Sequence, residues 1–270
     1  MSFVKKSTVP GARTASKSEL RRRLSSAPAA WLSQALENPE LGPTELMLVL
    51  RNPAAPATVL ERIGANRAWM GHHELRRGVA RHAHAPLAVA RNLLPYLYWK
   101  DWCEIAAHPA ANPVIRRQAE TMLLARIGEL GCGERIMLAR RATRGLIPAF
   151  LSDADPRVIQ ALLGNPRLVE IDLVRVANDT ANGAEVLRRV AEHPVWGQRR
   201  DLRLALLRRP ELAVQAALHL ARKMDRRDLQ MLVEDDKVPL IVRVGIERRL
   251  REDPGVRSPR NKPTGAGEWS

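Results

Sequence analysis

The side chains best suited to ligand chemistry lie in one short stretch of a chain whose aromatic content is only 4%. The stretch combines rings, a cation and a carboxylate: Tyr96, Tyr98, Trp99, Lys100, Asp101 and Trp102. Exposed rings here could stack on nucleobases or a cationic ligand, and Lys100 could contact a phosphate. The alternative, which we favour, is structural: the rings fill a wide gap between packed helices.

Arginine doublets form a second candidate surface. Seven of them recur along the chain: Arg76-Arg77, Arg116-Arg117, Arg140-Arg141, Arg199-Arg200, Arg208-Arg209, Arg226-Arg227 and Arg248-Arg249. Neighbouring helical residues point about 100° apart, so one arginine of a doublet can join an ion pair while the other faces solvent. Such a stripe would hold a phosphate backbone without reading its sequence. An equally weighted alternative is a solvated face neutralised by nearby acids.

The predicted binding residues come from these two features. They are Tyr98, Trp99, Lys100, Trp102, Arg116, Arg117, Arg140, Arg141, Arg199 and Arg200.

Nothing in the sequence is typical of a catalytic or metal centre. The two cysteines, Cys103 and Cys132, form no CxxC pair. Four histidines lie close in sequence but match no zinc-ligand spacing: His72, His73, His82 and His84. No GxSxG motif and no glycine-rich phosphate loop is present. We predict no catalytic residue, metal or cofactor, and enzymatic activity stays an open question.

Composition points to a helical protein with a positive surface. The 270 residues are 45% hydrophobic, mostly Leu, Ala, Val and Ile, and the formal net charge is +15. Residues 1–23 carry +6 and residues 251–270 carry +1, which leaves +8 for 24–250. A positive field favours encounters with nucleic acid, anionic membranes or acidic proteins. No secretory leader or membrane span is recognised, so we expect a soluble cytoplasmic protein.

Proline divides the chain into short helical segments. Asn-Pro, His-Pro and Asp-Pro steps recur every 10 to 30 residues, and apolar residues between them are spaced by three and four. Proline fits the first helical turn, where its missing N–H needs no partner, and a preceding Asn or Asp can cap the helix. Helices this short must bury their apolar faces on neighbours. We therefore predict an all-α solenoid.

The chain also contains an internal duplication. Residues 81–123 align with residues 208–250 without a gap, and Asp101 then falls on Asp228. Because Asp228 has no aromatic neighbours, we expect both aspartates to cap helices or link repeats. The predicted domains are a disordered basic segment over 1–17, a single solenoid over 18–250 and a flexible tail over 251–270.

Three segments resemble units of the HEAT family of helical repeats. They run from Asp236 to Leu250, from Asp155 to Leu163, and from Pro113 to Leu123. The resemblance implies a ladder between repeats, formed by an Asp near the turn and an Arg in the second helix. Asp236 with Arg243 would take these roles, and Arg116 fits the second one. His108 and Asn112 stand where the partner of Arg116 would be expected.

Two related families bear on function. The Asn-Pro steps before Val59 and Leu60 are similar to the leucine-rich-repeat variant, a bacterial solenoid whose iron–sulfur cluster this chain cannot hold, because it lacks clustered cysteines. Some HEAT-like DNA glycosylases use Trp and Asp side chains, roles open to Trp99, Asp101, Trp102 and Trp196, although the Trp–Asp spacing differs.

We expect a non-catalytic scaffold that binds an acidic partner, most simply a protein, on a concave face. The alternative is nucleic-acid binding, with alkylpurine excision as its special case. A lyase or assembly factor for pigment proteins is a weaker third possibility.

Overall fold

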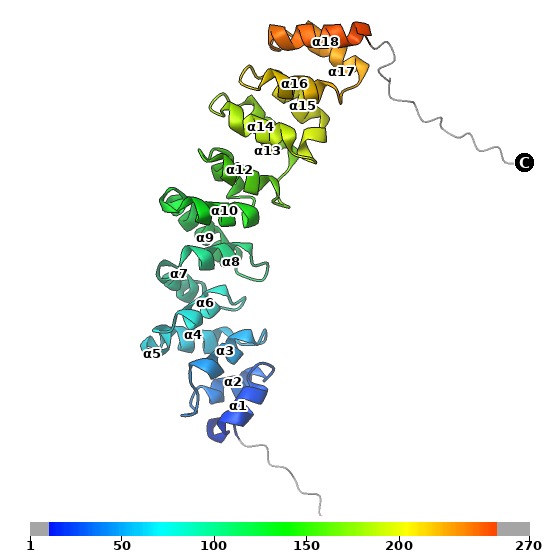
Figure 1. Ribbon diagram of the computed structural model, residues 1–270. Helices are drawn as coiled ribbons and strands as arrows, with labels where there is room; N and C mark the ends of the chain where they lie inside the picture. The colour runs from blue at the N-terminus through cyan, green and yellow to red at the C-terminus, as the bar shows by residue number, and fades with distance from the viewer. Residues whose placement is uncertain (1–10, 253–270) are drawn as a thin grey trace, which may run out of the picture. The chain divides into compact units, whose positions relative to one another are not determined.

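The computed structural model describes residues 11–252, and within that range every regular element is a helix (Figure 1). The chain forms two compact units that meet in sequence at Glu129 and Leu130. None of the described helices combines the length and apolar character needed to cross a bilayer. The all-α prediction is thus confirmed.

Unit 1 stacks short helices in two rows. Its elements are η1 (Ala12–Thr14), α1 (Lys17–Arg23), α2 (Ala29–Ala35), α3 (Pro43–Arg51), α4 (Ala57–Ala65), α5 (Arg67–Met70), α6 (His73–Arg81), α7 (Leu87–Leu93), η2 (Leu94–Tyr96), α8 (Trp99–Ala107), α9 (Pro113–Arg126) and η3 (Ile127–Glu129). In the first row α1, α3, α6 and α8 follow one another in contact. In the second row α2, α4, α7 and α9 do the same. Consecutive helices thus alternate between rows.

Unit 2 repeats this alternation. Its elements are α10 (Cys132–Arg141), α11 (Ile147–Leu151), α12 (Pro156–Leu163), α13 (Glu170–Asn178), α14 (Ala184–Glu192), η4 (Trp196–Gln198), α15 (Arg200–Leu207), α16 (Val214–Ala221), α17 (Arg226–Glu234) and α18 (Leu240–Glu252). One row contains α10, α12, α14, α16 and α18, and another contains α11, α13 and α15.

The internal duplication of the sequence reappears in the helix boundaries. When residues 81–123 are aligned with 208–250, the first residues of α7, α8 and α9 coincide with the first residues of α16, α17 and α18. The duplicated segments therefore form helices in the same register in the two units.

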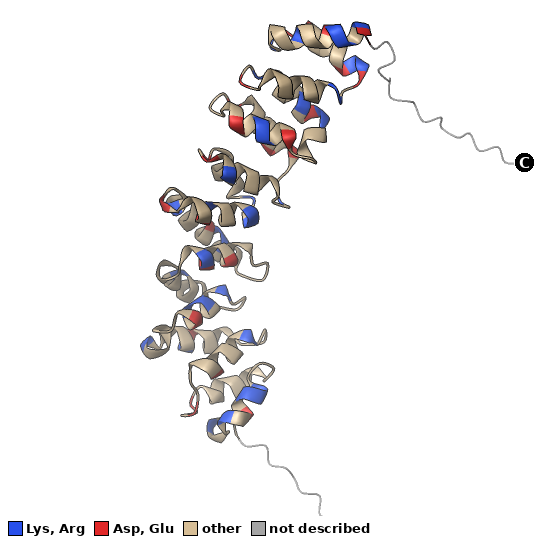
Figure 2. Ribbon diagram, viewed as in Figure 1, with Lys and Arg blue, Asp and Glu red and all other residues tan. Residues whose placement is uncertain are grey.

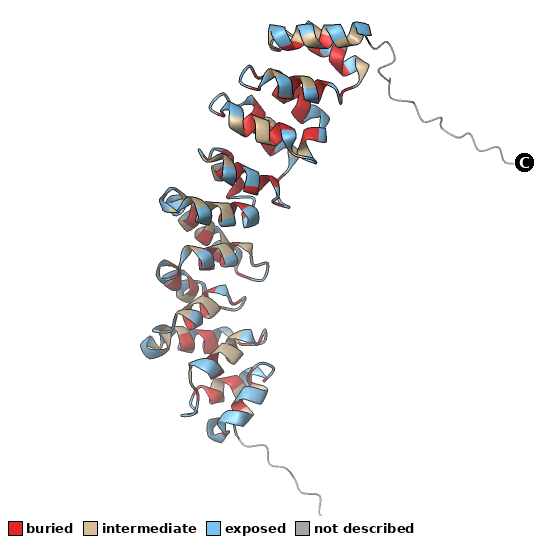
Figure 3. Ribbon diagram, viewed as in Figure 1, coloured by how far each residue is buried: buried red, intermediate tan, exposed pale blue. Residues whose placement is uncertain are grey.

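Helix starts follow the proline and cap pattern. Pro113 and Pro156 occupy the first turns of α9 and α12, and Asn112 and Asp155 accept a backbone N–H there. Between the starts, Leu, Val, Ile and Ala side chains are buried in each unit, while loops and outer helix faces are exposed (Figure 3). The core therefore runs between the two rows.

At several helix ends a side chain bonds to backbone carbonyls 23 to 32 residues earlier in the chain, in the segment that we call the preceding repeat. The Nδ2 of Asn52 donates to the carbonyls of Leu24 and Ala27 at 3.0 and 2.9 Å. Buried Asn38, Asn165, His82 and Arg209 make the same kind of contact with carbonyls of the repeat before them in the chain. These bonds satisfy carbonyls at helix ends and turns that lack an intrahelical partner.

The N-terminal boundary differs from the prediction of disorder through residue 17. Residues 1–10 lie outside the described part, but Ala12 and Ala15 are buried. The Nδ2 of Asn38 donates to both of their carbonyls at 2.9 Å. Small residues with satisfied carbonyls thus pack on unit 1 despite the polar composition around them. At the other end α18 extends to Glu252, and the rest of the predicted tail lies outside the described residues.

Candidate binding surface

Trp102 belongs to the core of unit 1. Its side chain is 1% exposed, and its indole N–H donates to the Leu94 carbonyl at 2.8 Å. The guanidinium of Arg126 lies 5.5 Å from the ring centroid. A ring covered in this way cannot stack on a ligand, so the structure removes Trp102 from the predicted binding surface and assigns it the gap-filling role.

The rest of the aromatic cluster is more open. Tyr96 and Tyr98 are 66% and 67% exposed, and Trp99 is half-buried with the Lys100 ammonium 5.5 Å from its ring centroid. The Tyr98 ring lies against the His73 ring of α6, with centroids 4.6 Å apart. Three of the predicted residues, Tyr98, Trp99 and Lys100, therefore stand together at the start of α8.

The predicted arginines do not gather on one helix row. Arg116 and exposed Arg117 lie on α9 of unit 1, where Arg116 Nε donates to the Ala106 carbonyl at 3.3 Å. Arg140 and Arg141 are exposed on α10 of unit 2, whereas Arg199 and Arg200 are exposed at the start of α15. Arg140 lines a cavity of about 570 Å³ with Arg157 and Arg189. Basic residues are spread over the helices of both units (Figure 2).

The aspartates of the predicted ladder divide into two groups. Asp101 accepts the Tyr98 N–H at 2.9 Å and lies 2.9 Å from His73 Nε2 of the preceding repeat. Asp228 pairs likewise with Arg200 of α15. Asp236 instead pairs with Arg243 at 3.1 Å across the first turns of α18, and Asp236 is 97% exposed. Asp101 and Asp228 thus connect repeats, and the Asp236–Arg243 pair is local.

The ladder that the structure contains is evenly spaced and alternates in charge. In unit 2 its members are Arg144, Asp172, Arg200 and Asp228. Arg144 pairs with Asp172, and Arg200 pairs with Asp228. In unit 1 Glu45, His73 and Asp101 have the same spacing in the sequence. His73 pairs with Asp101, whereas the partner of Glu45 is Arg21, at 2.8 Å. Each buried acid also sits in the first turn of its helix, where it is stabilised by free N–H groups.

Two adjacent cavities cover the α3 and α6 surface of unit 1 and reach the end of α8. Their volumes are about 390 and 470 Å³, and both are lined by Met47 and Arg51. We call them together the basic groove. The charged and histidine side chains that line the groove are Arg51, His72, His73, Glu74, Arg77, Arg81, His82 and His108.

The arginines of the basic groove differ in how well they are neutralised. Arg77 contacts Glu74 at 2.6 Å. Arg81 has only Glu104, at 3.8 Å, and the same carboxylate lies 3.7 Å from Arg77. Arg51 has no ion pair with any described residue. The first cavity has no acidic lining residue, so the groove can attract an anion.

Comparison with protein-family models, curated proteins and solved structures gave no match. The chemistry of the surface therefore has to be argued from the residues that form it.

His82 is a largely buried residue that lines the first cavity, and it is held as a neutral ring. Its Nδ1 accepts the His84 backbone N–H at 3.1 Å, so its Nε2 carries the proton and donates to the Asn52 carbonyl at 3.1 Å. Burial, with a smaller contribution from His84, lowers the pKa of His82 below its usual value.

This arrangement predicts a pH dependence of folding. Below about pH 6.5 the unfolded chain binds a proton at His82 more readily than the folded chain does, so the free energy of unfolding should fall as pH falls. Urea titrations of wild type and His82→Asn across this range test it. Asn forms the equivalent contact at position 52, so the variant should lose part of the pH dependence. If the free energy of unfolding of His82→Asn changed with pH as much as that of wild type, a neutral buried His82 would be contradicted.

The four clustered histidines take structural or groove positions. No group of His, Cys, Asp and Glu in the described range is arranged to hold a metal ion. His82 and His84 bond to carbonyls of the preceding repeat, and His73 pairs with Asp101.

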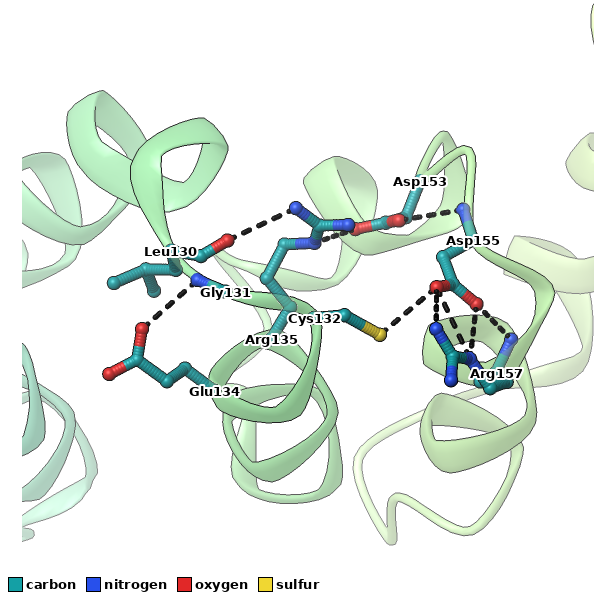
Figure 4. A network of polar contacts seen from close by, with 8 residues as sticks. All are labelled: Leu130, Gly131, Cys132, Glu134, Arg135, Asp153, Asp155 and Arg157. Atoms are coloured by element: carbon teal, nitrogen blue, oxygen red, sulfur yellow. Dashed lines mark hydrogen bonds and ion pairs between the residues drawn. The ribbon is translucent and has the colours of Figure 1, made fainter.

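A separate polar network surrounds Cys132 in unit 2 (Figure 4). The thiol donates to Asp155 Oδ2 at 3.0 Å, and Asp155 also contacts Arg157 at 2.8 Å. Arg135 contacts Asp153 at 3.0 Å beside it. The hydrogen bond to Asp155 is the main cause of a raised pKa of the Cys132 thiol. The network therefore holds Cys132 as a thiol, which is a poor nucleophile.

Asp155→Asn should make Cys132 more reactive. The amide keeps an acceptor for the Arg157 N–H that caps α12 but replaces the carboxylate oxygen that accepts from the thiol and holds it protonated. We expect alkylation by iodoacetamide near pH 8 to become several-fold faster, measured in a Cys103→Ser background. Asp153→Asn is the matched control, since Asp153 does not contact the thiol, and its rate should stay near that of the background protein. Equal rates for Asp155→Asn and the background would contradict the assignment.

None of the charged and histidine residues that line the groove was in the predicted binding set, and Arg51, Arg81 and His108 are the three that matter most for anion binding. Arg51 and Arg81 end α3 and α6, and His108 caps the end of α8. A recurring basic or histidine residue at the end of alternate helices is the sequence signal that points to them.

Proposed function

We propose that this protein is a non-catalytic HEAT-type α-solenoid that binds an acidic protein partner through the basic groove of unit 1. The alternation of short helices between two rows and the evenly spaced ion pairs between successive repeats support the solenoid assignment. The observation that carries the functional proposal is the first cavity, whose ionisable lining residues are three arginines and two histidines.

A protein partner fits this surface better than a small molecule. The groove extends over three successive helices of one row, and Arg51 connects its two cavities. An extended acidic segment could contact several arginines at once, and each charge-assisted hydrogen bond would contribute more than a neutral one. Complementary charge would also speed the encounter.

Nucleic-acid binding is the second candidate, and one observation favours it. Exposed Tyr98 lies against His73, which lines the groove, and Lys100 and half-buried Trp99 adjoin it. Exposed rings beside arginines are typical of single-strand binding surfaces. Base excision has less support within this candidate, because Trp102 is in the core and Trp196 donates its indole N–H to the Leu163 carbonyl in unit 2.

Fluorescence anisotropy of two labelled probes tests the proposal: a short oligoglutamate peptide and a single-stranded oligonucleotide, each titrated across salt with the full chain. Arg51→Glu/Arg81→Glu should abolish peptide binding. Arg67→Glu/Arg91→Glu is the control with the same net charge, made at exposed positions of unit 1 outside the groove, and it should bind nearly as wild type.

The outcomes separate the candidates. Equal loss in the two double variants would show only general charge attraction and would contradict a groove-bound partner. Tighter oligonucleotide binding that is weakened by Tyr98→Ala would favour nucleic acid. No binding of the peptide at physiological salt would remove the support for an acidic partner.

A further inference from the structure

The two similar halves of the sequence differ at one pair of positions in the basic groove. The alignment of 81–123 with 208–250 places Arg81 on Arg208 and His108 on Asp235. The aligned residues also occupy similar positions in the structure. Arg81 ends α6 and Arg208 caps α15, while His108 and Asp235 cap the ends of α8 and α17. A carboxylate in unit 2 is thus replaced by an imidazole in unit 1.

In unit 2 the carboxylate neutralises the arginine directly. Asp235 Oδ2 accepts from Arg208 Nε at 2.7 Å, and Asp235 Oδ1 accepts the Lys237 N–H at 2.9 Å. The contact with Arg208 is the main cause of a lowered pKa of Asp235. Arg208 is therefore neutralised by a carboxylate of the same chain.

In unit 1 the equivalent arginine, Arg81, has no carboxylate of the described chain within hydrogen-bonding distance. The closest carboxylate to Arg81, that of Glu104, is 3.8 Å away, beyond hydrogen-bonding distance, and Glu104 is 46% exposed. His108 stands in the place of the aspartate, and its Nδ1 is buried without a hydrogen-bond partner. Arg81 and His108 line the same cavity of about 390 Å³ with Arg51, which has no ion pair among the described residues.

We propose that this cavity binds a carboxylate group of the acidic partner, which neutralises Arg81 as Asp235 neutralises Arg208 in unit 2. The inference rests on the proposed function and specifies its ligand. The Arg81 guanidinium donates to the carboxylate, Arg51 adds a second cation, and the His108 ring donates once protonated. The cavity is unlike a solvated arginine surface because the apolar residues Met47 and Leu50 line it together with the arginines.

The histidine makes binding depend on pH. Burial, followed by the charge of Arg81, lowers the pKa of His108. Its other charged and titratable neighbours on the packed helices are Arg51, Arg77, His82, Glu104 and Arg116. A bound carboxylate favours the protonated ring, so the affinity for oligoglutamate should rise as pH falls from neutral.

His108→Asp rebuilds in unit 1 the carboxylate found in unit 2 and provides the sharpest test. The added aspartate should occupy the site and weaken oligoglutamate binding at least about tenfold, as expected for losing a charge-assisted contact and gaining repulsion. Thr121→Asp adds the same charge at an exposed position of α9 outside the groove and should cause a much smaller loss. Thermal melts followed by circular dichroism verify that both variants fold.

A second readout uses sodium acetate with the full chain and does not need the partner. The ring protons of His108, assigned by their absence in His108→Gln, should shift on acetate addition, and the pKa of His108 should rise. Sodium chloride at equal ionic strength should not reproduce this. If inorganic phosphate acts at much lower concentration than acetate, the carboxylate assignment is wrong.

The two readouts distinguish the possible failures. Equal oligoglutamate binding by wild type and His108→Asp, with His108 unmoved by acetate, would overturn the carboxylate site and leave the scaffold proposal standing. An acetate response without oligoglutamate binding would support the site and contradict the acidic-partner proposal.

Discussion

Replacing Trp102 by Ala is expected to destabilise unit 1 by about 3 to 5 kcal/mol, the range for truncating a buried aromatic side chain. The ring is 1% exposed, so its removal leaves a cavity. The surrounding helices cannot readily close this cavity, because their packing on neighbouring helices holds them in place. The Leu94 carbonyl also loses the indole N–H that it accepts at 2.8 Å. Urea titration followed by circular dichroism measures the loss.

Two variants separate the contributions to this effect. Trp102→Phe keeps most of the volume and removes the N–H donor, so it should cost clearly less than Ala. Tyr96→Ala truncates a neighbouring ring that is 66% exposed, and its effect should stay within about 0.5 kcal/mol. If Trp102→Ala matched Tyr96→Ala, the ring would not be a core residue. A loss of ligand binding in Trp102→Ala without a loss of stability would restore the stacking interpretation.

The sequence could locate this aromatic cluster but could not assign its rings. Trp99 and Trp102 are separated by one helical turn and therefore lie on similar sides of one helix. Trp102 is buried because Leu94 and Arg126, from other elements, close around it, whereas Trp99 stands in the first turn of α8 and is only half covered. Burial at this level depends on tertiary neighbours that the helical period does not specify.

The helical architecture, in contrast, could largely be predicted from the sequence. Pro113 and Pro156 begin helices as the proline pattern predicts, and apolar residues spaced by three and four supply the buried faces. Helices shorter than about four turns gain their stability from packing, so many short amphipathic segments already imply a stack.

The ion pairs of the ladder have a spacing that neither the internal duplication nor the family resemblance indicated. The internal duplication identified Asp101 and Asp228 as equivalent, but the family resemblance placed the ladder at Asp236 and Arg243. The pairs in unit 2 instead join Arg144 to Asp172 and Arg200 to Asp228, at one constant separation along the chain. This shorter period is hidden because acid and base exchange places at each step, so residue identity does not repeat although geometry does.

The basic groove could not be predicted as a cavity. Arg51 and Arg81 end two different helices that are well separated in sequence, and only the stacking of α3 on α6 brings them to one hollow. What the sequence did contain was the difference between His108 and Asp235 in otherwise similar copies. A position that carries a neutralising acid in one copy and lacks it in the other is where an external anion can be accommodated.

Asn165→Ala is expected to destabilise unit 2 by about 2 to 4 kcal/mol, because it removes three hydrogen bonds and leaves buried carbonyls unpaired. The Nδ2 donates to the carbonyls of Ala139 and Ala142 at 2.8 and 3.0 Å, and Oδ1 accepts the Arg167 N–H at 2.8 Å. Asn165 is 3% exposed, so water cannot readily replace it. Urea titration of the full chain measures the loss.

Asn165→Asp tests which half of the amide matters. The carboxylate keeps an acceptor for the Arg167 N–H but faces two carbonyls without a donor, so it should destabilise unit 2 at least as much as Ala does. Asn112→Ala is the comparison, since that amide caps α9 without reaching another repeat, and it should cost only about 1 kcal/mol. Equal losses at positions 112 and 165 would mean that the reach to the preceding repeat adds nothing beyond a cap. A larger loss at 165 would mean that this side chain couples neighbouring short helices, as nearest-neighbour contacts must in a stack of short helical repeats.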